Sequence, residues 1–314
     1  MSPLRILTLT MNPAVDLSTG VDRVMPTHKL RCEAPERHPG GGGVNVARVA
    51  TRLGADALAL FPAGGVGGQV LQTLLAGENV RFEATAIAGE TRENMTVHES
   101  AGGQDYRFVL PGPTLTNAET EACLARVLHH APTCGMVVAS GSLPPGVPPD
   151  FYAGLARALG AMGVPLVLDS SGPPLAAALA AGVHLCKPSL RELEEYCGQE
   201  LRTVDAQKAA CRAIVARGGA RMVALSLGAQ GALLVTAQAA WVSEALKVPA
   251  RSTVGAGDSF VAGMVRALAL GEPPEQAFAL AMAASAAAVM SAGTALCSKE
   301  DVHRLLAQVR IHPV

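Results

Sequence analysis

The chain has 314 residues, of which 49% are hydrophobic and 16% are charged, with a formal net charge of −1. This composition is typical of a globular protein with a large core, and it excludes a disordered chain. A near-neutral charge and an aromatic content of 3% disfavour nucleic-acid binding, which needs basic surface and stacking groups. The seven cysteines form no C-x-x-C pair, which predicts reduced thiols in a cytoplasmic protein.

Apolar runs of strand length alternate with helical patterns along the chain. This alternation predicts an α/β fold in which helices cover a mainly parallel central sheet. The expected strands are residues 6–10, 57–62, 136–139, 166–168, 184–186 and 222–227, and the expected helices are residues 117–130, 150–162, 190–197 and 205–217.

The carboxyl ends of the parallel strands are expected to converge on a ligand site. The segments that follow them are residues 12–16, 64–68, 140–142, 169–172, 187–192 and 228–231.

Two regions, about residues 18–38 and 91–109, differ from this pattern. Alternating apolar and polar residues around Gly102 and Gly103 predict a small antiparallel insertion with a hairpin turn, which could act as a lid. We therefore expect one domain over residues 1–314 that carries these two lid insertions.

Four consecutive glycines at positions 40–43 precede a helical pattern that ends at Gly54. Because such a run costs conformational entropy, it indicates that a ligand approaches the main chain closely, at Gly41 and Gly42. Asn45 would offer donors and an acceptor from the first helical turn. A flexible linker is the alternative, but serine and charged residues are missing and the helix follows at once.

The segment 276–298 contains no charged residue and is long enough to span a bilayer. Alanine dominates it and leucine and isoleucine are scarce. We therefore expect a helix packed between other elements and no membrane segment.

The segment 252–260 places two glycines around an alanine at the start of an apolar helical pattern. The backbone amides of Gly255, Ala256 and Gly257 would lie unobstructed at a helix N-terminus, where an anion is favoured. Asp258 would then lie beside a bound phosphate and accept a proton from an attacking hydroxyl. The alternative is an ordinary glycine turn with an aspartate near a helix start.

These glycine motifs resemble those of the ribokinase-like sugar kinases, the PfkB family, from about residue 4 to the C-terminal region. Residues 29–32, 61–65, 106–109 and 140–146 resemble members that phosphorylate fructose 6-phosphate. The resemblance implies a three-layer α/β sandwich with a β-sheet lid, and MgATP-dependent phosphorylation of the C1 hydroxyl of fructose 6-phosphate. Members acting on fructose 1-phosphate or tagatose 6-phosphate usually have lysine where this chain has Gly42, which favours fructose 6-phosphate. Phosphorylation of one of those two sugars is the alternative.

The resemblance also implies roles for residues around the sugar. Asp258 would be the base, and the amides from Gly255 to Asp258 would hold the transferred phosphate. The sugar hydroxyls would contact Asp16, Asn45 and Ser142, and the existing phosphate would contact Lys29, Arg31 and Arg92. These three cations could instead be solvated lid charges.

For ATP, the resemblance implies Lys187 and the turn that contains Ser226, Gly228 and Gly231. A plain hairpin turn is the alternative for these glycines. Glu192 would help to place Mg²⁺ through water, with Ser189 standing where the family has asparagine. A K⁺ ion is implied near Ser252, Val254, Ala288, Ser291 and Gly293, mostly through backbone carbonyls.

Two functions of other classes remain open. A dinucleotide-binding dehydrogenase would use the glycines of segment 64–68, although Val70 occupies the third fingerprint position. A non-catalytic sugar-phosphate sensor would not need the intact Asp258. No histidine has partners at metal-ligand spacing, which argues against zinc.

The lid is also expected to make the protein a homodimer. Its alternating strands have an apolar face that needs cover, and in the family that the chain resembles the lid sheets clasp each other. Lys29 and Arg31 could then reach the sugar phosphate of the neighbouring subunit.

Overall fold

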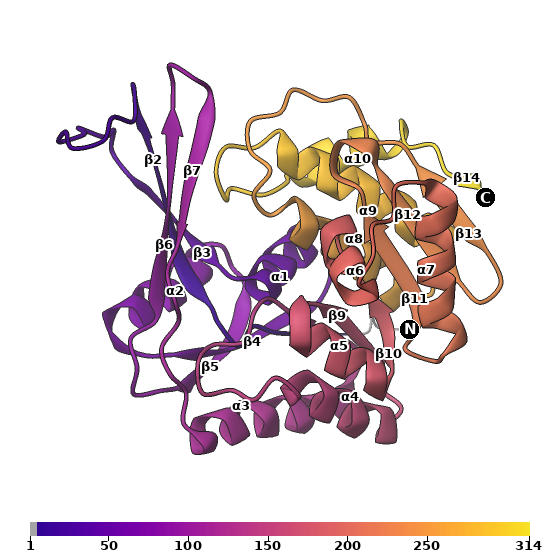
Figure 1. Cartoon of the computed structure of the whole chain (residues 1–314). Helices are drawn as coiled ribbons and strands as arrows, with labels where there is room; N and C mark the ends of the chain where they lie inside the picture. Colours follow the sequence, from indigo (N-terminus) through magenta and orange to yellow (C-terminus); the bar gives the residue numbers. More distant parts are fainter. Residues whose placement is uncertain (1–4) are drawn as a thin grey trace.

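The central element is a ten-stranded sheet with the order β14-β13-β12-β11-β10-β9-β8-β1-β4-β5 (Figure 1). The structure of the chain is a computed structural model that describes residues 5–314, so the first four residues of the expected domain lie outside the described part. The strands from β11 to β5 run parallel, and β12, β13 and β14 are antiparallel. The strand bounds are β1 Arg5–Leu9, β4 Ala57–Ala63, β5 Arg81–Ala86, β8 Cys134–Ser140, β9 Leu166–Asp169, β10 Val183–Cys186, β11 Ala220–Ser226, β12 Ala232–Thr236, β13 Ala240–Ser243 and β14 His312–Pro313.

Helices cover both faces of this sheet, which confirms the predicted α/β layering. Successive strand residues such as Ile6 and Leu7 belong to different core clusters because their side chains alternate between the two faces. The face of Ile6 packs against α1 Gly42–Arg52, α2 Gly65–Gly77, α8 Ala256–Ala269, α9 Pro274–Val289 and α10 Lys299–Leu306. The face of Leu7 packs against α3 Asn117–His130, α4 Phe151–Ala161, α5 Gly172–Ala181, α6 Leu190–Cys197 and α7 Val204–Ala216.

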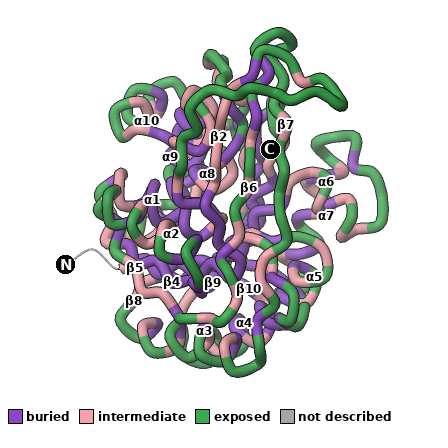
Figure 2. The backbone as a smooth tube through the Cα atoms, turned by 90° about the vertical axis from the view of Figure 1, so that its left-hand side faces the viewer, coloured by how far each residue is buried: buried purple, intermediate pink, exposed green. Residues whose placement is uncertain are grey.

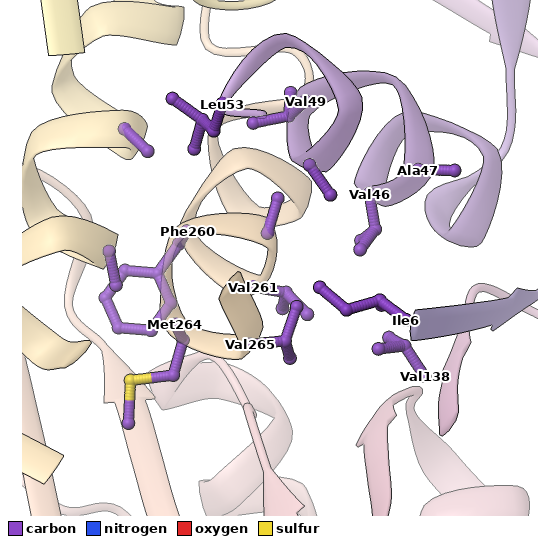
Figure 3. Packing of buried hydrophobic residues seen from close by; sticks show 14 of the residues in the cluster. Ile6, Val46, Ala47, Val49, Leu53, Val138, Phe260, Val261, Met264 and Val265 are labelled. Atoms are coloured by element: carbon purple, nitrogen blue, oxygen red, sulfur yellow. The ribbon is translucent and has the colours of Figure 1, made fainter. Parts of the chain in front are cut away.

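Helices α1 and α8 pack side by side over the sheet, and their contact is called the α1–α8 seam below. Val46 of α1 and Val261 and Val265 of α8 lie near Ile6 of β1 (Figure 3). Each of these side chains is fully excluded from solvent. The seam therefore fixes the two helix N-termini relative to the central strands.

Helix α9 confirms the prediction of a helix packed between other elements, but it begins at Pro274, includes Glu275 and ends at Val289, so residues 290–298 of the predicted segment lie outside it. A side chain at Gly263 of α8 would collide with the backbone of α9 near Ala281, so the glycine lets the two helices approach closely. Phe260 and Phe278 add an edge-to-face contact with ring centroids 6.1 Å apart. No helix within residues 5–314 has the length and apolar character needed to cross a bilayer.

A second sheet stands over one end of the strands and is called the lid. Its order is β3-β2-β6-β7, with β2 Ala14–Val21, β3 Glu36–Gly40, β6 Arg92–Glu99 and β7 Gln104–Val109. Pairs β2–β3 and β6–β7 are antiparallel, but β2 and β6 run parallel, so the expectation of a wholly antiparallel insertion is corrected. Figure 2, which views the molecule from the lid side, shows that β7 is mostly exposed.

Candidate functional site

A cleft of about 340 Å³ lies between the lid and the carboxyl ends of the central strands. Both the core and the lid contribute to its walls. Ten of the residues predicted for the site line it: Asp16, Gly41, Gly42, Asn45, Arg92, Ser142, Glu192, Val254, Gly255 and Asp258.

Asp258 lies in the first turn of α8, as the glycine motif predicted. Gly255 caps the helix with a φ of 73°, and a side chain there would collide with Leu296, so this position requires glycine. The amide of Asn45 donates a hydrogen bond of 2.8 Å to Oδ2 of Asp258. Desolvation and the nearby charge of Asp169 nevertheless raise the pKa of Asp258 to about 6. The carboxyl group is therefore ionised at neutral pH and close to the range that suits a general base.

Lys187, which follows β10, places a positive charge beside this helix start. Its Nζ lies 3.1 Å from Oδ1 of Asp169, and a side chain at Gly257 would begin 3.4 Å from the same Nζ. Burial lowers the pKa of Lys187, but the carboxylates of Asp169, Glu192 and Asp258 together more than offset this and hold the pKa above its ordinary value. An anion at the start of α8 would meet both the helix dipole and this ammonium group.

The glycine cluster is explained in part by the packing of the chain against itself. A side chain at Gly40 would collide with the Asp16 carboxyl group, and one at Gly42 would collide with Oγ of Ser140. The interpretation that ligand approach alone requires these glycines is therefore corrected. Gly41 and Gly42 do line the cleft, so their bare backbone is also open to a ligand.

Polar side chains surround the part of the cleft under the lid. Asp16 accepts a hydrogen bond of 2.9 Å from Nδ2 of Asn94, and burial raises the pKa of Asp16. Oγ of Ser142 accepts a hydrogen bond of 3.2 Å from Nδ2 of Asn12. Together with Asn45, these groups offer both donors and acceptors to the hydroxyls of a sugar.

The four cations near the lid differ in how they are held. The guanidinium of Arg92 donates to the backbone carbonyls of Asn12, at 2.9 Å, and Leu110, at 2.8 Å. Arg107 is exposed, lines the cleft and forms no ion pair within residues 5–314. Lys29 and Arg31 lie on an exposed loop and do not line the cleft of their own chain.

The predicted nucleotide residues form a strip beside Glu192. Ser189 caps α6: its hydroxyl accepts from the Glu192 amide at 3.3 Å, and Oε2 of Glu192 accepts from the Ser189 amide at 2.7 Å. Ser189 also forms a bridge with Ser226. Gly228 then begins a short turn with a φ of 59°, and a side chain there would meet no atom within 4 Å. Gly228 thus offers bare backbone, whereas a side chain at Gly231 would collide with the carbonyl of Ser243. Neither glycine lines the cleft, so the predicted convergence of segment 228–231 on it is wrong.

The residues predicted for K⁺ lie on two adjacent segments at the end of α9. The amide of Ser252 donates to the carbonyl of Val289 at 3.2 Å, and the amide of Ser291 donates to the carbonyl of Ala288 at 3.0 Å. Val254 follows in the first segment and Gly293 in the second. Turns of this kind present several backbone oxygens, which are the ligands that a hard cation prefers.

Segment 64–68 does not join the cleft, so its predicted convergence is wrong. The Gly67 amide at the start of α2 donates a hydrogen bond of 2.6 Å to Oε1 of Glu90, and the Gly64 amide donates a hydrogen bond of 3.1 Å to Oγ1 of Thr91. Because a carboxylate of the protein already fills this helix start, the geometry disfavours the dehydrogenase alternative.

Sequence reasoning missed several side chains at the site. Asp169 belongs to a segment that was expected there, but its pairing with Lys187 was not predicted. Asn94 and Arg107 fall within the predicted lid, where their position on the cleft-facing side could have been read from the period of two. Within residues 5–314, no cluster of three or more histidine, cysteine or acidic side chains is arranged to hold a metal ion.

Comparison with known proteins places this geometry in context. Residues 9–301 match the model of the pfkB family carbohydrate kinases. The chain is 48% identical over 300 residues to the ATP-dependent 6-phosphofructokinase isozyme 2 of Mycobacterium tuberculosis, covering 96% of this chain and 88% of that protein. It is 42% identical over 305 residues to the same isozyme of Escherichia coli, covering 97% and 98%.

Solved structures of the Escherichia coli phosphofructokinase-2 have the same fold. A complex with fructose-6-phosphate aligns with a TM-score of 0.92 at 40% identity, and a complex with potassium aligns with a TM-score of 0.93 at 42% identity. Each alignment covers 97% of this chain and 99% of the other. These matches confirm the predicted α/β fold with its small lid sheet.

Proposed function

The chain belongs to the pfkB family of carbohydrate kinases, and we propose that it transfers the γ-phosphate of ATP to the C1 hydroxyl of fructose 6-phosphate. The observation that carries this proposal is Asp258, which lies at the start of α8 beside Lys187, at the base of a cleft lined by polar groups. The names of the relatives supply the nucleotide and the sugar phosphate.

The proposed reaction is a direct transfer of the phosphoryl group from ATP to the sugar, with Asp258 as the base. Asp258 takes the proton of the C1 hydroxyl, and the C1 oxygen forms a bond to the γ-phosphorus. The bond from that phosphorus to the β,γ-bridging oxygen breaks, so ADP leaves and fructose 1,6-bisphosphate forms. The amides of Gly255, Gly257 and Asp258 and the ammonium of Lys187 stabilise the negative charge on the transferred group. The Ala256 amide, which was predicted to join them, donates to the carbonyl of Thr253 at 3.4 Å.

We further propose that the site binds Mg²⁺ and K⁺. The carboxylates of Glu192 and Asp169 line the cleft and offer the oxygen ligands that Mg²⁺ prefers. Bound Mg²⁺ would neutralise phosphate charge. The segments around Ser252 and Ser291 would hold K⁺. We expect chelation to abolish turnover until Mg²⁺ is added back, and replacement of K⁺ by tetramethylammonium to lower it.

The choice of sugar is tested by a coupled kinase assay with fructose 6-phosphate, fructose 1-phosphate and tagatose 6-phosphate. We expect the largest kcat/KM with fructose 6-phosphate, because this chain has Gly42 where family members that act on the other two sugars usually have lysine. A larger kcat/KM with either of the other two sugars would contradict the assignment of fructose 6-phosphate as the substrate. Binding without ADP release would identify a sensor, and reduction of a nicotinamide cofactor would identify a dehydrogenase.

We also propose that two lids pair in a homodimer. Met95 and Phe108 are paired across β6 and β7, on the face of the lid opposite to that of Asn94 and Arg107. They are 40% and 50% exposed, so this face carries apolar surface that needs cover. Covering it with a second lid would also exclude water from the reacting phosphate. Lys29 and Arg31 would then serve the cleft of the partner subunit.

Mixing two inactive variants tests this arrangement. One variant carries Asp258→Asn, and the other carries Lys29→Ala with Arg31→Ala. Each mixed dimer would hold one complete site, so random exchange should restore roughly a quarter of wild-type activity. No recovery, with mixed dimers demonstrated by tagged subunits, would contradict the shared site, and an active monomer in sedimentation would contradict the dimer.

A further inference from the structure

A fully buried arginine lies behind the site, on the second turn of α1. Arg48 is 0% exposed and does not line the cleft. Its Nε and Nη2 donate to the Glu78 carboxylate at 2.9 and 2.6 Å. A buried charge is costly even when it is paired, so its other contacts indicate what this charge contributes.

The remaining nitrogen of Arg48 faces the catalytic end of the seam. Nη1 donates to the carbonyls of Pro39 and Thr294, at 2.9 and 3.2 Å, and to Oδ1 of Asn45 at 3.1 Å. Asn45 is itself 4% exposed and donates from Nδ2 to Asp258. One carboxamide thus connects the guanidinium to the proposed base.

The two ends of this carboxamide are not interchangeable. A guanidinium has only donors, so Arg48 can satisfy the oxygen of Asn45 but not its NH₂ group. If the amide turned over, its NH₂ would face the guanidinium and its oxygen would face the Asp258 carboxylate. Both new contacts would be repulsive, and both would occur where water has little access.

We propose that Arg48 is a positioning residue for catalysis, which holds the NH₂ group of Asn45 toward Asp258 and so keeps the base ionised at neutral pH. This inference rests on the proposed role of Asp258 as general base. It assigns a function to a side chain that touches neither the sugar nor the nucleotide.

The charges around Asp258 make its ionisation depend on the orientation of the Asn45 amide. Asp169 at the end of β9 and Asp16 on β2 oppose its ionisation, whereas Lys187 after β10 favours it. On the α1 side, the hydrogen bond from Asn45 is the group that favours the ionised form. Since the pKa of Asp258 is about 6, a rise of one or two units would leave much of the base protonated at neutral pH.

Arg52 provides a matched control one helical turn further along. Its Nη2 donates to the same Glu78 carboxylate at 2.8 Å, and its Nη1 donates to the carbonyls of Ala295 and Cys297. It makes no contact with Asn45. Arg52→Met therefore removes the same charge from the same ion-pair cluster without freeing the carboxamide.

The test is a carbon-13 NMR titration of the Asp258 carboxyl group, whose signal is assigned by its loss in Asp258→Asn. In Arg48→Met the midpoint should rise by about one to two pH units, equivalent to a tenfold to hundredfold change in the ionisation constant. In Arg52→Met it should stay within a few tenths of a unit. In an Asn45→Ala background, Arg48→Met should cause no further rise.

An unchanged midpoint in Arg48→Met, or an equal rise in Arg52→Met, would overturn the inference. If Arg48→Met does not fold, Arg48→Leu replaces it. Leucine likewise offers no donor to the oxygen of Asn45, so the midpoint should still rise, and an unchanged midpoint would again overturn the inference. Turnover of Asp258→Asn is measured alongside: wild-type turnover would refute the base itself, whereas an inactive variant with an unmoved midpoint refutes only the role of Arg48.

Discussion

The α1–α8 seam and the lid form opposite walls of one cleft but are held in place very differently. Asn45 lies in the seam with nearly all of its surface buried, and its carboxamide is bonded at both ends. On the lid, Phe108 and Val109 line the same cleft while 50% and 62% exposed. The groups proposed for chemistry are therefore fixed by packing, and the wall that admits the substrate has fewer restraints.

The largest effect is expected at the seam, from Asp258→Asn. Asparagine keeps the shape of the side chain but cannot accept the proton, so kcat should fall by ~10²–10⁴-fold. Steady-state rates of the purified variant measure this, with circular dichroism and sugar-phosphate binding as controls. Turnover near that of the wild type would remove Asp258 from the mechanism.

Two phenylalanines compare the packing of the two walls. Phe260 in α8 is 3% exposed and Phe108 in the lid is 50% exposed. Phe260→Ala should lower the free energy of unfolding of the separated subunit by about 3–5 kcal/mol, and Phe108→Ala by less than about 0.5 kcal/mol. Urea unfolding at a subunit concentration low enough to separate the subunits measures both. Equal losses would show that the lid is as tightly packed as the seam.

Asp258→Asn should also stabilise the fold above pH 6. The pKa of the carboxyl group rises from 3.8 to about 6 on folding, so the folded chain binds the proton more tightly than the unfolded chain. The wild type then loses stability as the pH rises from 4 to 6, and the neutral asparagine avoids a loss of about 2–3 kcal/mol. The free energies of unfolding of Asp258→Asn and wild type are measured at pH 4 and at pH 8. The variant should gain stability relative to wild type between pH 4 and pH 8, and a relative loss would contradict the prediction.

The lid arginines should give the smallest changes. Arg107→Ala should raise the KM for the sugar phosphate by about tenfold to a hundredfold, through loss of one charge-assisted contact, and leave the KM for ATP unchanged. Arg92→Ala should raise the same KM and also lower the melting temperature, because Arg92 supports the base of the lid through backbone carbonyls. If both variants raise the KM for ATP as much as the KM for the sugar phosphate, the two arginines act on lid closure and not on the phosphate of the sugar.

Much of the fold could be predicted because its signals are local. Helices α3 and α6 begin and end at the predicted residues, since Thr116 and Ser189 each form a capping box with a glutamate three residues later. Strands β5, β12, β13 and β14 were not predicted. β5 alternates weakly at the sheet edge. The glycine turn at residues 227–231 joins β11 and β12 as an antiparallel hairpin, which was the alternative to a nucleotide loop, and the strands that follow it were missed.

The site divides along a similar line. Asp258, Asn45 and the glycines could be predicted because a helix start and a bare backbone are visible in a few consecutive letters. The pairing of Asp169 with Lys187 and the contact of Arg48 with Asn45 depend on how separate elements meet, and no local pattern encodes this. The asparagine that the family pattern led us to expect at position 189 is replaced by another good helix cap, so Glu192 keeps its support.

The contact between Gly42 and Ser140 has a consequence for how this site can change over generations. Because any side chain at 42 would begin inside the space of the Ser140 hydroxyl, a lysine can be acquired there only if that hydroxyl turns aside or residue 140 becomes smaller. Either change alters the hydrogen bond of the Ser140 hydroxyl to Asp169. The route from this glycine cluster to a lysine-bearing one therefore passes through position 140.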